Sequence, residues 1–227
     1  MVDDKVNFDK HIQQQVNKAN SIMGLIRRTY TFLDETSFRY LFQALVRPHL
    51  EYAEAVWSPF TKKDIDTIEK VQKRATKLIP SLQNMDYPNR LKKLKMPTLQ
   101  YRRLRGDMIE VYKIINGIYD HKVVTGFFEL SDVEQTRGHN KKLRKLSCKI
   151  NKRKNYFSNR VIDIWSNLPQ EAVSAKSVKD FEIAIDKHWE NQEMKYNHNA
   201  NIELKTERKR SYTTIQRDDD KIEADRV

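Results

Sequence analysis

The sequence predicts a mainly α-helical protein: a three-helix bundle at 1–80, a basic and mostly helical region at 81–192 that contains one short extended segment, and a disordered charged tail at 193–227. Apolar residues recur at three- and four-residue steps, and most of the six prolines fall between such stretches rather than inside them. Beyond residue 192 the chain has many charges and few large apolar groups, so it cannot offset the entropy of ordering.

Three amphipathic segments make up the predicted bundle. The first carries an apolar stripe from Phe8 to Ile26. The second follows Asp34, a candidate helix N-cap, and is kinked or restarted at Pro48, which lacks a backbone donor. The third follows Thr61 and crowds cations on its outer side: Lys63, Lys70, Lys73, Arg74 and Lys77. Three helices with such faces pack into a small bundle.

Four further helices are expected in the second region, at 89–95, 98–119, 155–168 and 177–189, because their apolar residues keep the helical spacing. Between 136 and 151 the spacing weakens. That segment is predicted to be extended or looped, and the pattern does not decide between helix and strand.

The positive charge is local. The chain has 43 basic and 31 acidic side chains, a net charge of +12 and a pI near 9.6. Residues 89–106 hold seven basic side chains and no acid, and residues 137–160 hold ten and no acid. Positive charges at this density repel one another, and binding to a polyanion is the simplest way to offset that repulsion. A solvated or salt-bridged basic surface is the alternative.

Several kinds of function are not expected. The single cysteine, Cys148, excludes an internal disulfide, and no phosphate-binding loop, nucleophile elbow or paired-histidine metal motif occurs. Neither Asp3-Asp4 nor Asp218-Asp219-Asp220 sits on a strand that could hold two metal ions. No signal peptide or membrane span is recognisable. We therefore expect an intracellular protein, nuclear or in a cytoplasmic ribonucleoprotein, without catalysis, cofactor, membrane or small-molecule substrate.

The candidate contacts to nucleic acid are the cations of the third helix, of the helix after Thr98 and of the second basic run, with one aromatic residue. Tyr156 is the candidate for base stacking, whereas the spacing of Phe157 and Trp165 favours the core. The full set is Lys70, Lys73, Arg74, Lys77, Arg102, Arg103, Arg105, Lys141, Lys142, Arg144, Lys145, Lys152, Arg153, Lys154, Tyr156 and Arg160.

Several short sequence motifs resemble those of the jockey-like non-LTR retrotransposon reverse transcriptases, in the segment that follows the palm of these enzymes. They occur in the family's order over about residues 5–190. They include Gly24-Leu25-Ile26-Arg27-Arg28, Arg47-Pro48-His49-Leu50-Glu51-Tyr52-Ala53, Val56-Trp57-Ser58-Pro59, Tyr101-Arg102-Arg103-Leu104-Arg105-Gly106-Asp107, Thr136-Arg137-Gly138-His139 and Trp165-Ser166-Asn167-Leu168-Pro169.

The resemblance implies a thumb, at 1–80, followed by the C-terminal region of such a polymerase, with RNA, DNA or an RNA–DNA hybrid as partner. The sequence departs from the complete pattern, because the fingers, the palm with its aspartates and the endonuclease are not in it. Magnesium would belong only to the complete polymerase. We therefore expect a non-catalytic nucleic-acid-binding fragment. The alternative is a helical protein-interaction or self-associating fragment, which would use the apolar face that packs on the palm and fingers in the family.

Overall fold

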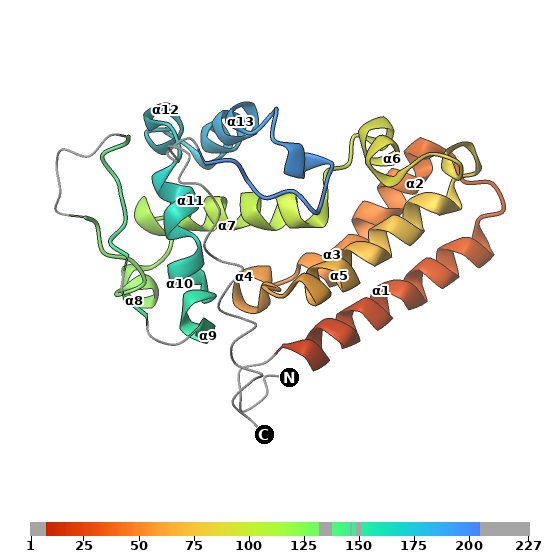
Figure 1. The fold of residues 1–227 in the computed structure, drawn as a ribbon, viewed down its shortest axis with the longest axis horizontal. Coiled ribbons are helices and arrows are strands. Elements are labelled where there is room, and N and C mark those ends of the chain that lie inside the picture. The colour runs from red at the N-terminus through yellow and green to blue at the C-terminus, as the bar shows by residue number, and fades with distance from the viewer. Residues whose placement is uncertain (1–7, 132–137, 146, 149–150, 205–227) are drawn as a thin grey trace, which may run out of the picture.

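The computed structural model describes residues 8–131, 138–145, 147–148 and 151–204, and over these ranges the chain is mainly helical, as predicted (Figure 1). The elements up to residue 115 are α1 (Asp9–Thr29), α2 (Glu35–Leu41), the π-helical turn η1 (Phe42–Val46), α3 (Arg47–Glu51), α4 (Glu54–Trp57), α5 (Lys62–Ala75), the 3-10 turns η2 (Thr76–Leu78) and η3 (Pro80–Leu82), α6 (Tyr87–Leu94) and α7 (Leu99–Ile115). The later elements are α8 (His121–Val124), α9 (Asn151–Lys154), α10 (Phe157–Arg160), α11 (Ile162–Ser166), α12 (Gln170–Val173), α13 (Val178–His188) and the 3-10 turn η4 (Glu193–Lys195).

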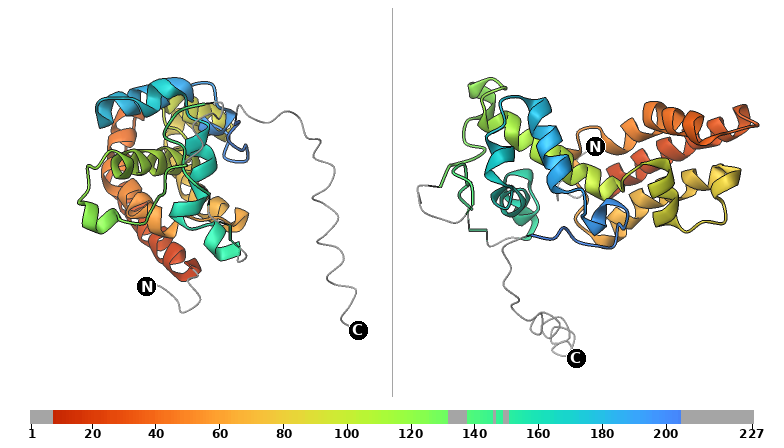
Figure 2. Two further views of the ribbon diagram at one scale, coloured as in Figure 1. Left: turned by 90° about the vertical axis from the view of Figure 1, so that its left-hand side faces the viewer. Right: turned by 90° about the horizontal axis from the view of Figure 1, so that it is seen from above.

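The first three predicted helices are confirmed. Asp34 caps α2, accepting from the backbone N–H groups of Thr36 and Ser37 at 2.7 Å each. Pro48 lies in the first turn of α3, where it costs no helical hydrogen bond, and the preceding turn widens into η1. α1 packs against both α5 and α3, and the helices of this half lie side by side in Figures 1 and 2.

Two hydrophobic cores divide the molecule, and α7 enters both. The first runs from Ile12 to Leu99 and includes α6. The second begins at Tyr101 and ends at Met194. The border between the two cores therefore lies inside the first turn of α7, and α7 runs from the first core through the helices of the second (Figure 1).

Three of the four helices predicted in the second region are shorter than expected or divided, whereas α6 begins two residues before its predicted start. α7 ends at Ile115 because Gly117, with φ +67°, has left the helical region. The single helix expected at 155–168 is two short ones, α10 and α11, joined at Val161. The segment expected to be extended contributes one antiparallel bridge, Leu130 with Leu143, and the described ranges contain no longer strand.

The tail is ordered at its start. Met194 is 2% exposed in the second core. Thr98 donates through its hydroxyl to the Met194 carbonyl at 2.8 Å and through its N–H to the Lys195 carbonyl at 2.9 Å. The prediction of disorder is therefore wrong for 193–204, because tertiary hydrogen bonds hold this polar segment. Residues 205–227 lie outside the described residues, with Asp218-Asp219-Asp220.

Candidate nucleic-acid interface

One face of α5 and η2 is cationic, as predicted. Thr61 caps α5 by accepting from the Asp64 N–H, and the buried side of the helix carries Ile68, Val71 and Ala75. The opposite side carries four exposed cations at the spacing i, i+3, i+4 and i+7, which places them on one face. These are Lys70, Lys73, Arg74 and Lys77, called the α5 face below. None of them forms an ion pair with an acid of the described ranges.

α6 adds exposed cations to the same half of the molecule. Lys92 and Lys95 are exposed, while the exposed Lys93 pairs with Glu35 at 2.9 Å. The guanidinium of Arg90 is buried instead, and its Nη2 donates to the Lys73 carbonyl at 3.3 Å, which ties α6 to α5. Lys92 and Lys95 were not among the predicted contacts, although the run of seven cations at 89–106 contains both.

The arginines at the start of α7 do not form the predicted free cationic surface. Arg102 binds Glu51 of α3 through two hydrogen bonds, with Nη2 3.0 Å from Oε2. Arg105 binds Asp186 of α13 in the same bidentate way, with Nη2 2.9 Å from Oδ2. Arg102 and Arg105 therefore each form an ion pair that joins two helices. This agrees with the alternative expectation of a salt-bridged basic surface.

Arg103 is 3% exposed, which contradicts its prediction as a surface contact. Burial lowers the pKa of its guanidinium, and the neighbouring acids Glu54 and Glu69 oppose that shift when they are ionised. Arg160 is also withdrawn from solvent, with 16% of its side chain exposed, because it pairs with Asp107 of α7 at 2.8 Å. Neither residue can contact a phosphate in this arrangement.

The second basic run is partly paired. Arg144 and Lys145 are exposed but lie beside Glu129 and Asp163, at 3.3 and 2.5 Å. Such exposed pairs are weak and exchange readily with other partners. Lys141 donates to the Asn116 side chain at 2.7 Å, and Lys142 is half-buried.

α9 carries the exposed cations Arg153 and Lys154. The side chain of Lys152 lies outside the described residues. Tyr156 follows α9 and is 46% exposed, as a stacking residue must be. Trp165 is fully buried, which confirms its place in the core, and Phe157 is half-buried against that core.

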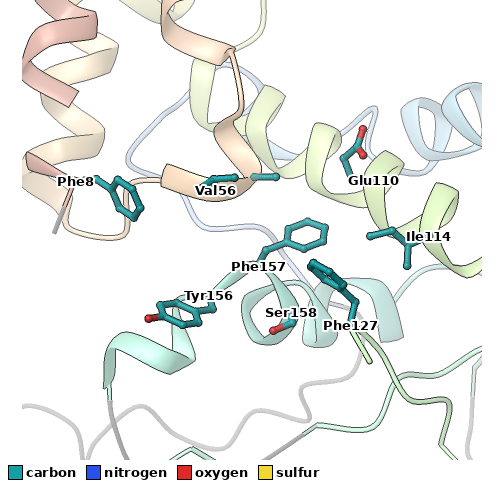
Figure 3. A pocket seen from close by; sticks show the side chains of 9 residues that line it. Phe8, Val56, Glu110, Ile114, Phe127, Tyr156, Phe157 and Ser158 are labelled. Atoms are coloured by element: carbon teal, nitrogen blue, oxygen red, sulfur yellow. The ribbon is translucent and has the colours of Figure 1, made fainter. Parts of the chain in front are cut away.

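An apolar cavity of about 510 Å³ opens beside Tyr156 (Figure 3). Its wall brings together the start of α1, α4, the C-terminal half of α7, the chain near Phe127 and the start of α10. The lining residues are Phe8, Ala55, Val56, Glu110, Ile114, Phe127, Tyr156, Phe157 and Ser158. The size and the mainly apolar lining are those of a binding cavity. This cavity could not be predicted from sequence patterns, because its residues come from five separated segments.

No three His, Cys, Asp or Glu side chains within the described ranges are grouped so that they could hold a metal ion. No helix within them is long and apolar enough to cross a membrane.

Comparison with known proteins does not assign the chain to a family. The chain is 27% identical over 121 residues to "Uncharacterized protein B0403.1" of Caenorhabditis elegans. The match covers 52% of this chain and 61% of that protein, so the chain spans less than two thirds of the length of its relative. No protein-family model and no solved structure matches.

Proposed function

We propose that this chain is a non-catalytic nucleic-acid-binding module whose principal contact is the α5 face, as expected for a piece of a retrotransposon reverse transcriptase that lies after the palm. The observation that carries the proposal is the exposure of four cations on one helix face without an acidic partner in the described ranges. Seven positions of helix span about 10 Å. Each strand of a duplex carries one phosphate about every 3.4 Å along the duplex axis, so a face of this length can reach about three phosphates.

Contacts of this kind read charge and helix shape rather than bases, so RNA, DNA and RNA–DNA hybrid are all expected to bind. Arg153, Lys154 and Tyr156 supply a second contact, in which the ring stacks on a base beside the two cations. Lys92 and Lys95 are added to the proposed surface. Arg102, Arg103, Arg105 and Arg160 are removed from it, because their charges are paired or buried. The module needs no cofactor and is expected to work in an intracellular ribonucleoprotein.

The test is the salt dependence of binding to a labelled hybrid duplex. Changing Lys70, Lys73, Arg74 and Lys77 together to Gln should lower the affinity at least tenfold in low salt. It should also make the slope of log K against log salt concentration shallower by about 3, because each lost phosphate contact removes about 0.9. The matched control changes four exposed lysines elsewhere, Lys122, Lys176, Lys179 and Lys187, to Gln.

The control variant removes the same number of positive charges. If the α5 face is the specific contact, only the first variant should show a shallower slope of log K against log salt concentration. Equal losses in both variants would mean that net charge, not this face, drives binding, and an unchanged affinity in the first would exclude the proposal. A primed template with magnesium and nucleotides should remain unextended, and extension would contradict the proposed absence of catalysis.

The apolar cavity favours a second candidate, a protein-interaction function. Val56 is 68% exposed and Tyr156 is 46% exposed at its wall, and exposed apolar groups that line a cavity are typical of an interaction site. Self-association measured by sedimentation should then rise with protein concentration and be lost when Val56 and Tyr156 are both changed to Ser. A monomer at all concentrations would remove self-association from this candidate.

A further inference from the structure

α4 is a short helix held between the two halves of the molecule. Ala53 begins it in the left-handed region, with φ 55°. Its last residue, Trp57, is 3% exposed. The indole Nε1 of Trp57 donates to the Tyr52 carbonyl at 2.7 Å, and its ring lies 5.2 Å from that of His11 in α1. α4 itself packs on α7. The indole N–H therefore reports whether α4 keeps its place.

The inner side of α4 buries a carboxyl group against α7. The Oε1 of Glu54 lies so close to Gly106 that a Cβ there would be 2.6 Å from it. The Oε2 of Glu54 is buried and has no hydrogen-bond partner within the described residues. The same holds for all three side-chain nitrogens of Arg103. The carboxyl group of Glu54 and the guanidinium of Arg103 influence each other electrostatically, and Glu54 Oε2 and the three Arg103 nitrogens lack the hydrogen bonds that would stabilise a buried charge.

Charged groups surround this site on every side that packs against it. α7 contributes Arg102, Arg103 and Asp107, α3 contributes Glu51 and Arg47, and α5 contributes Glu69. From α10, Arg160 neutralises Asp107. Burial raises the pKa of Glu54 to about 8, although the positive charge of Arg103 lowers it. Burial also raises the pKa of Glu69, although a hydrogen bond from Tyr87 opposes that shift.

We propose that α4 is a pH-responsive element of the fold, which the protonated carboxyl group of Glu54 holds on α7 and which ionisation of that group loosens. The packed form binds the proton more tightly than a form in which Glu54 faces water. The contribution of Glu54 to packing is therefore complete below about pH 4.5 and is lost as the pH rises through about 8. This inference does not depend on the proposed nucleic-acid binding.

Loosening of α4 would also affect the apolar cavity, because the outer side of α4 forms part of the cavity wall. Ala55 and Val56 form part of the cavity wall, and the Ala55 carbonyl accepts from Arg160 Nη2 at 3.0 Å. A loosened α4 would therefore carry away one wall of the cavity in Figure 3. Occupancy of the cavity and the ionisation of Glu54 are then linked: rising pH weakens the binding of a ligand that needs this wall.

The experiment follows indole hydrogen exchange in the full chain by nitrogen-labelled NMR from pH 6.5 to 9, with each rate corrected for the intrinsic pH dependence. With pKa values of about 4.5 in the open form and 8 in the packed form, the opening constant at Trp57 should rise about 30-fold and level off above pH 8. Trp165 and Trp189 of the second core are internal controls and should not follow it. A flat response at Trp57, or equal responses at all three indoles, would overturn the proposal.

Glu54→Gln should abolish the pH response at Trp57, because the amide cannot ionise. Glu171→Gln, an exposed acid on α12, should leave the response intact. A response that persisted in Glu54→Gln would also overturn the proposal. If this variant does not fold, carbon NMR of the glutamate carboxyl groups of the unmodified chain decides. A group assigned to Glu54 that titrates near pH 8 supports the proposal, and titration near 4.5 refutes it.

Discussion

Arg160 and Asp107 form a bidentate ion pair across 53 positions of the sequence, with Nη2 2.8 Å from Oδ1 and Nε 3.1 Å from Oδ2. The pair joins α10 to α7, and the side chain of Asp107 is only 3% exposed. Arg160 also donates to the Ala55 carbonyl of α4. The guanidinium of Arg160 thus links α10 to both α7 and α4, which are far apart in the sequence.

Arg160→Ala should therefore be strongly destabilising. It leaves the Asp107 carboxylate buried without its counter-charge, which costs about 3 kcal/mol of unfolding free energy. Urea denaturation followed by circular dichroism measures this loss. The control is Arg144→Ala, which breaks the exposed pair with Glu129 and should cost less than about 1 kcal/mol. Similar losses in the two variants would mean that burial of the Asp107 pair has no special importance.

Because Arg102 and Arg105 are held in ion pairs, their loss should lower the stability of the protein without weakening its binding to nucleic acid. Arg102→Gln and Arg105→Gln should each lower the midpoint of urea unfolding, because Arg102 joins α7 to α3 of the first half and Arg105 joins α7 to α13 within the second half. Affinity for a hybrid duplex should change less than twofold in either variant. If binding instead fell as it does when the α5 face is neutralised, these arginines would have to leave their partners to reach the nucleic acid.

Two glycines within helices should respond oppositely to alanine. Gly24→Ala in α1 places the new Cβ 3.7 Å from the nearest side-chain atom, so the gain in helix propensity, about 0.5–1 kcal/mol, should appear as added stability. Gly106→Ala in α7 would meet Glu54 Oε1 at 2.6 Å and should destabilise the chain. Thermal unfolding of both variants gives the signs. Stabilisation by both changes would show that Glu54 moves aside at no cost.

Thr98 is expected to hold the C-terminal segment in place. Its hydroxyl accepts from the Tyr101 N–H, as the N-cap of α7, and donates to the Met194 carbonyl. Thr98→Val keeps the shape but loses both bonds, which should cost about 1–2 kcal/mol. Thr98→Ser should retain most of the stability. Limited proteolysis should cut the valine variant first near Lys195, and an unchanged cleavage pattern would argue against this anchor.

The sequence was sufficient for the features that depend on local spacing. The α5 face follows from four cations at helical intervals opposite Ile68, Val71 and Ala75, and Asp34 and Thr61 cap the helices after them. These features need only neighbours within one or two turns, so the pattern of the chain contains them.

The sequence was not sufficient where the partner of a residue is distant. Arg102 meets Glu51 at a separation of 51 positions, and Arg105 meets Asp186 at 81. A run of arginines has the same appearance in the sequence whether its charges face solvent or acids on other helices. Met194 was missed for a similar reason, because a single apolar residue in a polar stretch gives no periodic signal.

Because the two cores meet within the first turn of α7, the chain cannot be cut cleanly into the parts that its composition suggests. A fragment that ended at residue 80 would lack Leu82, Leu91 and Leu94, all 2% exposed or less, and would leave the rest of its interior open to solvent. A fragment extended to Leu99 would complete that interior but split α7. Expression of either half alone should therefore yield aggregation-prone material.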